Sequence, residues 1–307
     1  MWIGLACALA AGLMWGLVFV APLLLPEYPA ALLAVGRYLA FGLIALPLAL
    51  VDLRSLRRLS RADWWEAVRL SLIGNFIYYL CLAAAIQRAG GPLPTVIIGT
   101  LPVVIAVCSN VGAGALPWRR LAPALALMLA GIACVNQVEL AALDAAELPR
   151  YFGGAALALV ALACWTWYPI RNAAWLQSHG DRQPRAWATA QGLVTLPMAL
   201  IGLVFLAGFS DFHPLLGPRP PVFVGLMLAV GLLASWLGTL CWNAASQRLP
   251  TGLLGQLIVF ETLSALVYAW LLRGSWPAPL TLLGAALLIG GVWLGLRAYR
   301  GSAASAG

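Results

Sequence analysis

The feature that most constrains this chain is its division into apolar stretches of about 20 residues, separated by short polar connections. An α-helix needs about 20 apolar residues to cross the hydrocarbon core of a bilayer, so each stretch is long enough to span it. We therefore expect an all-α membrane protein with ten transmembrane helices. With charged residues, Pro and Gly as boundaries, the predicted spans are 2–22, 30–51, 65–87, 92–113, 119–137, 152–171, 185–207, 221–246, 250–272 and 277–298.

The composition argues against a soluble domain. Hydrophobic residues make up 63% of the 307 residues and charged residues only 9%, whereas a soluble domain has about 25% charged residues. The mean hydropathy of +0.93 agrees with burial in a lipid bilayer, which we expect as a partner. The 18 basic residues are all Arg and are dispersed along the chain, so the net charge of +8 indicates residues that flank spans, and no nucleic-acid partner is expected.

Several kinds of reactive site are not indicated by the sequence. The six cysteines lie singly inside apolar stretches without a C-x-x-C pair, so we expect neither disulfides nor a metal site. The two histidines, His179 and His213, fall in connections on opposite sides of the membrane, and no nucleotide-binding loop or catalytic triad is visible. We therefore expect a protein that is not an enzyme, needs no cofactor and is not driven directly by ATP.

The distribution of arginine predicts the orientation of the spans, because arginine is more frequent in cytoplasmic connections. The first apolar run is too long for a signal peptide and has no basic segment before it, so we expect it to be retained as span 1. With ten spans and both termini in the cytoplasm, twelve arginines fall inside and four outside. The inner ones are Arg54, Arg57, Arg58, Arg61, Arg119, Arg120, Arg171, Arg182, Arg185, Arg248, Arg297 and Arg300, and the outer ones are Arg88, Arg150, Arg219 and Arg273.

An internal repeat divides the chain into two halves. The segment LCLAAAIQR at 80–88 matches LCWNAASQR at 240–248 in six of nine positions, at an offset of 160 residues without a gap. We expect a first five-helix repeat at 1–137, a second at 152–299 and a short cytoplasmic tail at 300–307. Because five is odd, the second copy enters the membrane inverted, an architecture that recurs in secondary transporters with a site between the halves. The alternative is a helical scaffold or a membrane enzyme built by duplication.

These features resemble a known group of transporters. The short connections, the duplication, LMWG at 13–16 and TLPVVIAV at 100–107 resemble the EamA-type branch of the drug/metabolite transporter (DMT) superfamily. The stretch GLLGQLIVFETLSALVYAWLL at 252–272 and the tryptophan-rich sixth span resemble, more specifically, the aromatic amino acid exporters of the YddG type. Thr262 departs from the pattern, since the superfamily often has proline there.

The resemblance implies a location and a mechanism. It implies a multi-pass protein of the bacterial inner membrane that exports its substrates from the cytoplasm by alternating access, with spans 1, 3, 4, 6, 8 and 9 around a central cavity. The partners expected on this basis are a small-molecule substrate, such as an amino acid or a related metabolite, and the lipid bilayer. The sequence leaves the oligomeric state open, with a monomer as one of the states it allows.

Two charged residues lie inside predicted spans, away from the membrane surface. Glu261 is near the middle of span 9, where a charged side chain costs about 2.5–3.5 kcal/mol to insert. It either binds substrate or a proton, facing a wet cavity, or forms a structural hydrogen bond between helices. Arg37 lies about two turns into span 2, and it either pairs with a carboxylate such as Glu261 or binds the carboxylate of a zwitterionic substrate.

Polar and aromatic side chains in four spans predict the walls of the cavity. In spans 3 and 8 they recur on one helical face, where lipid would not stabilise them. In span 6, the segment CWTWYPIRN places tryptophan about halfway across the membrane, and Pro169 is expected to end or kink the helix. The repeat places Trp15 opposite Trp165. The cavity residues predicted in this way are Asn75, Tyr78, Tyr79, Trp242, Asn243, Trp165, Tyr168 and Trp15, with Ser235, Thr239 and Ser246 on the same polar face of span 8.

The function that the sequence favours is secondary transport. Aromatic walls suit apolar or aromatic side chains, so we expect export of small neutral metabolites, in particular aromatic and other neutral amino acids. In this prediction Arg37 and Glu261 meet the two charged groups of the zwitterion, or each other when the site is empty. The alternative within the class is a proton-coupled multidrug or nucleoside exporter, with Glu261 as the coupling group. A membrane enzyme or a lipid-scrambling factor is the alternative from another class.

Overall fold

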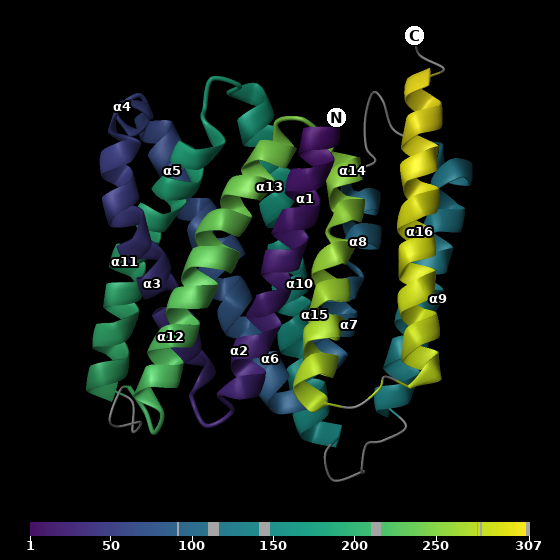
Figure 1. Ribbon diagram of the computed structural model, residues 1–307, viewed down its shortest axis with the longest axis horizontal. Coiled ribbons are helices and arrows are strands. Elements are labelled where there is room, and N and C mark those ends of the chain that lie inside the picture. The colour runs from purple at the N-terminus through teal and green to yellow at the C-terminus, as the bar shows by residue number, and fades with distance from the viewer. Residues whose placement is uncertain are drawn as a thin grey trace.

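The computed structural model describes residues 1–90, 92–109, 117–140, 148–209, 216–274, 276 and 278–304, and every regular element within these ranges is a helix. The helices stand side by side in one bundle, with the N-terminus and the end of the last helix at the same edge (Figure 1). Seven helical segments are long and apolar enough to cross a membrane. They are Trp2–Leu24, Ala30–Val51, Arg61–Ala89, Pro149–Ser178, Pro184–Gly208, Pro220–Ser246 and Thr251–Leu272.

Among the described residues, the N-terminal part of the chain forms five runs of helix through the bundle, which we call passes. The first, third and fourth passes are built from more than one helical element. The elements in order are α1 (Trp2–Trp15), a 3₁₀ turn (Gly16–Phe19), α2 (Val20–Leu24), α3 (Ala30–Val51), α4 (Leu53–Leu56), α5 (Arg61–Ser71), a π-helical segment (Leu72–Ile77), α6 (Tyr78–Ala89), α7 (Pro92–Gly99), α8 (Leu101–Ser109) and α9 (Trp118–Leu140). Each break lets one pass change direction slightly inside the bundle.

The C-terminal part forms five further passes. The elements are α10 (Leu148–Ser178), α11 (Pro184–Phe209), α12 (Pro220–Val230), a second π-helical segment (Gly231–Leu237), α13 (Gly238–Ser246), α14 (Thr251–Leu257), α15 (Val259–Arg273) and α16 (Pro279–Ala304). The π-helical segments occupy the third and eighth passes, and single non-helical residues, Thr100 and Ile258, interrupt the fourth and ninth.

Most predicted span boundaries agree with these helices within a few residues, but two differ. The expected end of span 6 at residue 171 is wrong, because α10 continues past Pro169 to Ser178. A proline is tolerated inside a membrane helix where neighbouring groups satisfy the carbonyl that it leaves free. The last helix, α16, continues through residues 300–304 of the predicted tail, while 305–307 lie outside the described residues. Residues 110–113 of predicted span 4 lie outside the described residues too.

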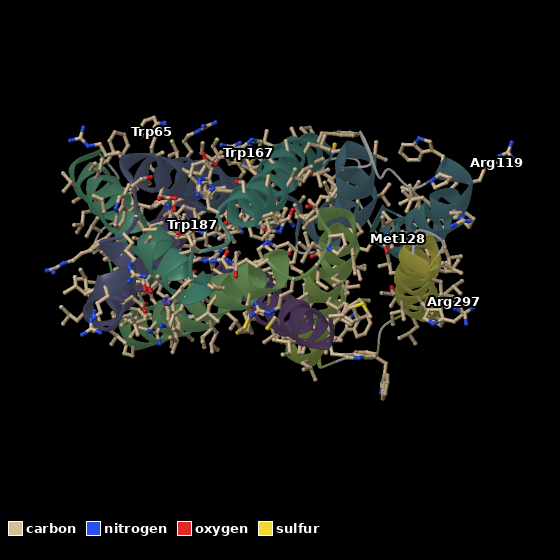
Figure 2. The ribbon with its side chains drawn as sticks, turned by 90° about the horizontal axis from the view of Figure 1, so that it is seen from above. Trp65, Arg119, Met128, Trp167, Trp187 and Arg297 are labelled. Atoms are coloured by element: carbon tan, nitrogen blue, oxygen red, sulfur yellow. The ribbon has the colours of Figure 1, made fainter. Side chains whose placement is uncertain are left out.

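The helices pack in pairs that join the two parts of the chain. The main pairs are α3 with α11, α9 with α16, α6 with α10, α1 with α13 and α8 with α14. The α9–α16 pair stands at one end of the molecule, where Arg119 and Arg297 are labelled in Figure 2. Trp187 lies inside the bundle and is fully buried, whereas Trp65 projects from its rim (Figure 2). Apolar side chains such as Ile201 and Val204 are exposed, as lipid contact requires.

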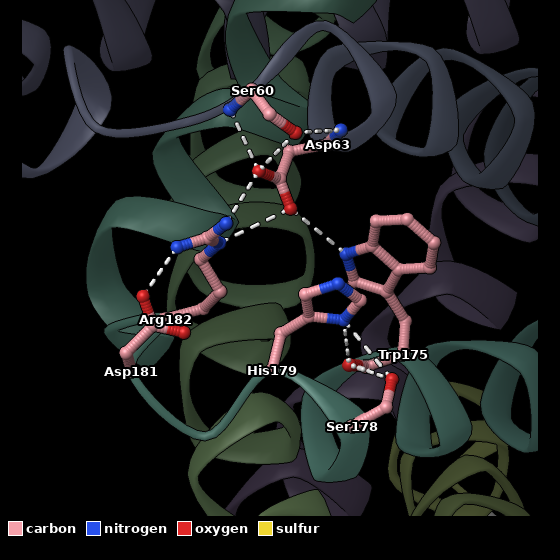
Figure 3. Close-up of polar contacts among 7 residues, drawn as sticks. All are labelled: Ser60, Asp63, Trp175, Ser178, His179, Asp181 and Arg182. Carbon is pink, nitrogen blue, oxygen red and sulfur yellow. Dashed lines mark hydrogen bonds and ion pairs between the residues drawn. The ribbon is translucent and has the colours of Figure 1, made fainter.

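Ion pairs tie the N-terminal part to the C-terminal part at the edge that carries the N-terminus. Asp63, buried at the start of α5, accepts hydrogen bonds from Arg182 (2.8 Å), from Trp175 (3.2 Å) and from its own cap residue Ser60 (Figure 3). The hydrogen bond with Asp63 raises the pKa of the Arg182 guanidinium, in the connection between α10 and α11, above its ordinary value. Glu66 pairs with Arg171 (2.6 Å) in the same way. These contacts fix how α5 and α10 sit against each other.

Candidate functional site

Glu261 is fully buried in the middle of the bundle, in the first turn of α15. Its carboxyl group accepts a hydrogen bond from Trp165 Nε1 (2.9 Å) and another from Tyr78 Oη (3.2 Å). The interruption at Ile258 places the acid at the N-terminal end of α15, where the helix dipole favours negative charge. The chain therefore binds this carboxyl group with neutral donors from α6 and α10.

Five aromatic side chains pack together next to Glu261, and two of them, Tyr78 and Trp165, bind its carboxyl group. We call the five the aromatic cluster: Trp15, Tyr78, Trp165, Tyr168 and Trp242. The Trp165 ring stacks on Tyr78 (4.5 Å between centroids) and on Tyr168 (5.0 Å). Trp15 meets Trp165 edge to face at 5.0 Å and lies 5.1 Å from Trp242. All five rings are buried, so α1, α6, α10 and α13 contribute rings to one patch beside the acid.

Two glycines allow the rings to approach the helices so closely. A Cβ atom on Gly74, in the first π-helical segment, would overlap the ring of Tyr168. A Cβ atom on Gly238 would stand 2.7 Å from Trp15 Nε1. Tyr168 is further held by a hydrogen bond from its hydroxyl to Gln191 Oε1 (2.9 Å). The orientation of the aromatic cluster therefore depends on small residues that the sequence pattern alone does not single out.

A second group of predicted residues gathers around Arg37. The Arg37 side chain is buried, and its Nε donates to Ser235 Oγ (3.0 Å) in the second π-helical segment. Its guanidinium lies over the ring of Tyr79 (4.4 Å) and over that of Tyr38 (5.0 Å). Among the described residues Arg37 forms no ion pair, so the structure does not bring Arg37 and Glu261 together as a pair. The acid is already bound by Tyr78 and Trp165.

Asn75 and Asn243 lie in different surroundings. Asn75 is buried in the first π-helical segment, one helical turn before Tyr79, and its Nδ2 has no hydrogen-bond partner among the described residues. Asn243 lies apart from both groups. It accepts from Asn172 Nδ2 (2.9 Å) and donates to the carbonyl of Pro184 (3.2 Å), while Trp187 donates to Asn172. Asn243 therefore belongs to a hydrogen-bond chain that connects α13 with α10 and α11.

One residue of the Arg37 group, Tyr38, is absent from the predicted cavity residues. Tyr38 follows Arg37 directly, but a single tyrosine in an apolar span is as typical of core packing as of binding. Ser235 stands 160 residues after Asn75, which is the offset of the internal repeat. That correspondence is the reason why the sequence predicts Ser235 on the same face of span 8 as Trp242.

Cavities lie beside these groups. One of about 650 Å³ runs between α8 and α10 and is lined mostly by apolar side chains, with Thr166 and Arg171 on its wall. Another of about 340 Å³ lies at the edge opposite the N-terminus and is lined by Gln87, Arg88 and Arg150, among others. The aromatic cluster lines neither of these two cavities, because its rings pack against one another. Among the described residues, no three His, Cys, Asp or Glu side chains lie where they could hold a metal ion.

Comparison with known proteins places this chain in a family. The sequence model of the EamA-like transporter family matches residues 2–137. The inner membrane protein YtfF of Escherichia coli (strain K12) is 53% identical over 305 residues, covering 96% of this chain and 95% of YtfF. The chain belongs to the EamA-like transporter family. The EamA-type membership expected from the sequence is thus confirmed, and this EamA-like protein is a membrane transporter of the DMT superfamily. The closer resemblance to aromatic amino acid exporters stays a prediction.

A solved structure matches the fold of this EamA-like transporter. A crystal structure with 18% sequence identity covers 97% of this chain, and 98% of its own length is covered, with a TM-score of 0.71. At that identity the likeness concerns the fold alone. It agrees with the all-helical bundle of the described residues and carries no information on the substrate.

Proposed function

We propose that this EamA-like transporter exports small neutral metabolites, with aromatic and other neutral amino acids as its substrates, by alternating access. The observation that carries this proposal is a buried carboxyl group in the middle of a membrane bundle, hydrogen-bonded by two rings of a cluster of five. A carboxylate at that depth can bind the ammonium group of an amino acid, and the rings offer apolar and stacking surface to its side chain.

The proposed architecture is two inverted five-helix repeats, 1–137 and 152–299. The packing of the helices supports it. A two-fold axis between the halves would exchange the first pass with the sixth, the second with the seventh, and so on. Such an axis maps each of the observed pairs α3–α11, α9–α16 and α8–α14 onto itself. The same axis exchanges α1–α13 with α6–α10. Both π-helical segments and both single-residue interruptions fall at corresponding places in the two halves. The site lies where such halves meet.

The proposed location is the bacterial inner membrane, with both termini in the cytoplasm. The excess of arginine at the edge that carries α4 supports this orientation, and the N-terminus and the end of α16 share that edge (Figure 1). The relative YtfF is described as an inner membrane protein. A solute would then reach the aromatic cluster from either side in turn, as the two halves rock.

The packed rings imply a step in which they separate. Trp165 contacts Trp15, Tyr78 and Tyr168 at once, so a bound solute has to replace some of these contacts. Replacing one stacking partner with another keeps the apolar surface buried, which favours a solute that itself carries a ring. This is the physical reason for placing aromatic amino acids first among the substrates.

The proposal is tested by counterflow of a panel of radiolabelled amino acids into proteoliposomes that hold the purified protein. We predict that Glu261→Gln lowers the transport of phenylalanine or tryptophan by about tenfold or more, because the amide cannot neutralise the ammonium group. Asp181→Asn, in an exposed connection, serves as the control and should transport like the wild type. Transport by Glu261→Gln at the wild-type rate would reject the role of the acid.

A second candidate is a proton-coupled exporter of drugs or nucleosides. It is favoured by one observation, that Glu261 is fully buried and receives only neutral donors, so that it could take up and release a proton during the cycle. The two candidates separate in liposomes with an imposed pH gradient. Accumulation driven by the gradient, and lost in Glu261→Gln, would favour proton coupling over facilitated diffusion.

A further inference from the structure

Arg37 carries a buried charge that forms no ion pair with any described residue. Its side chain is 4% exposed, and its Nη1 has no hydrogen-bond partner among the described residues. The buried acids are bound elsewhere: Asp52 to Arg185, Asp63 to Arg182, Glu66 to Arg171, and Glu261 to Tyr78 and Trp165. An isolated cation inside a membrane bundle is costly, and such a charge is usually paired in at least one state of the protein.

Several hydrogen-bond donors around Arg37 have no acceptor among the described residues. The hydroxyl groups of Tyr38 and Tyr79 are buried without a hydrogen-bond partner among the described residues, and so is Asn75 Nδ2. Both tyrosine rings lie against the guanidinium, and they meet each other edge to face at 6.2 Å. Ser235 already accepts from Arg37 Nε, which fixes the orientation of the guanidinium. One negatively charged acceptor would satisfy the charge and several of these donors together.

We infer that Arg37, Tyr38 and Tyr79 form a binding subsite for a small monovalent anion. The anion has two possible sources, the carboxylate of the transported amino acid or free chloride. The first source rests on the proposed function, and the second does not. A carboxylate fits the planar guanidinium, since its two oxygens can accept from Nη1 and from a tyrosine hydroxyl.

The subsite has a defined relation to Glu261. Tyr78 binds Glu261 and the next residue, Tyr79, packs on Arg37, so the acid and the base contact neighbouring residues at the start of α6. A zwitterion bound there would place its ammonium group at Glu261 and its carboxylate at Arg37. The subsite thereby excludes amines that lack a carboxylate, which leave the cation unneutralised, and it sets substrate class as well as orientation.

The first experiment measures binding without transport. The melting temperature (Tm) of the purified protein in detergent is first measured in a buffer whose only anion is a bulky sulfonate. It is then measured after acetate, benzoate or chloride has been added to that buffer, and the two values are compared. We expect an added anion to raise the wild-type Tm by about 2 °C or more, and to do so equally in the control Arg248→Gln, an exposed arginine. We expect no rise in Arg37→Gln, and a smaller one in Tyr79→Phe, which keeps the ring.

The pattern of Tm shifts either identifies the source of the anion or overturns the inference. A rise with acetate and benzoate alone identifies a carboxylate subsite, and a rise with chloride identifies a subsite for inorganic anions. No rise with any anion overturns the inference. An equal rise in Arg37→Gln or an undiminished rise in Tyr79→Phe also overturns it. If Arg37→Gln does not fold, Tyr79→Phe and the charge-preserving Arg37→Lys decide the result.

The second experiment separates this inference from the proposed function. Counterflow of phenylalanine into proteoliposomes is measured with excess phenylalanine, phenylalanine amide or phenethylamine as competitor. A carboxylate subsite predicts that phenylalanine competes at least about tenfold better than either amine, and that Arg37→Gln removes the difference. Equal competition by the amines contradicts the carboxylate source. If no amino acid is transported at all, the proposed function fails, while the Tm shifts still test the anion subsite.

Discussion

At the scale of single residues, the site is a buried acid whose partners are neutral. Trp165 supplies a donor that cannot also accept, so its Nε1 holds one carboxyl oxygen of Glu261 in place and leaves the ring free to stack on Tyr78 and Tyr168. Removing that donor while keeping an aromatic ring separates the two roles of the residue.

We predict that Trp165→Phe destabilises the protein by about 1–3 kcal/mol, because one buried carboxyl oxygen loses its hydrogen bond. Transport should fall more than stability does, since the acid is no longer held in position. The check is thermal unfolding in detergent alongside counterflow. Trp65→Phe, on the exposed rim, is the matched control, and equal losses in the two variants would contradict the prediction.

The sequence reveals Glu261 and Arg37 because a charge inside an apolar run is visible without any structure. It does not reveal their partners. Helical periodicity places a residue on a face of its own helix but does not say which helix covers that face. For this reason Asn75 and Asn243 have the same signature in the sequence, although the first lies beside Tyr79 and the second bridges to Asn172. Tyr38 was missed for the same reason.

At the scale of elements, α5 is fixed to α10 and to the connection after it by acidic residues of the N-terminal part and arginines of the C-terminal part (Figure 3). Asp63 has two tasks there, because it closes the capping box at the start of α5 with Ser60 and also receives Arg182 and Trp175. The capping box was visible in the sequence as S-x-x-D, but the partners from α10 and its connection depend on the packing of distant segments.

We predict that Asp63→Asn destabilises the protein by about 2–4 kcal/mol, through the lost cap bond and the buried charge pair. In a double-mutant cycle with Arg182→Gln, the two losses should be strongly non-additive, since both variants break the same ion pair. Unfolding in detergent measures the cycle, with exposed Arg57→Gln as the control. Additive losses would mean that Asp63 acts through the helix cap alone.

Elements were easier to predict than their ends. Spans such as 30–51 follow from apolar length and a flanking proline, and the helix found there has the same bounds. The end of α10 was misplaced because Arg171 and Asn172 are polar residues typical of a membrane boundary. In the structure Arg171 pairs with Glu66 and Asn172 with Asn243, so the helix continues within the bundle. Polar residues that find partners in the protein do not end a membrane helix.

At the scale of the whole molecule, the proposed inverted repeat makes equivalent residues end on opposite sides of the membrane. Arg88 ends the matching segment of the first copy, and Arg248 ends that of the second. The two arginines lie at opposite edges of the bundle, because Arg88 lines the cavity at the edge away from the N-terminus and Arg248 lies near Gly4. A side chain at one position is therefore expected to meet a different compartment from its counterpart, although their sequences match.

We predict that alkaline phosphatase fused after Arg88 is active, because the enzyme requires the oxidising periplasm, and that the same fusion after Arg248 is inactive. Fusions of green fluorescent protein at these two positions should give the reverse pattern. A fusion at Arg58, in the arginine-rich connection, controls for the cytoplasmic side and should behave like Arg248. Equal phosphatase activity after Arg88 and Arg248 would place both on one side of the membrane, and the two halves would then not be inverted copies.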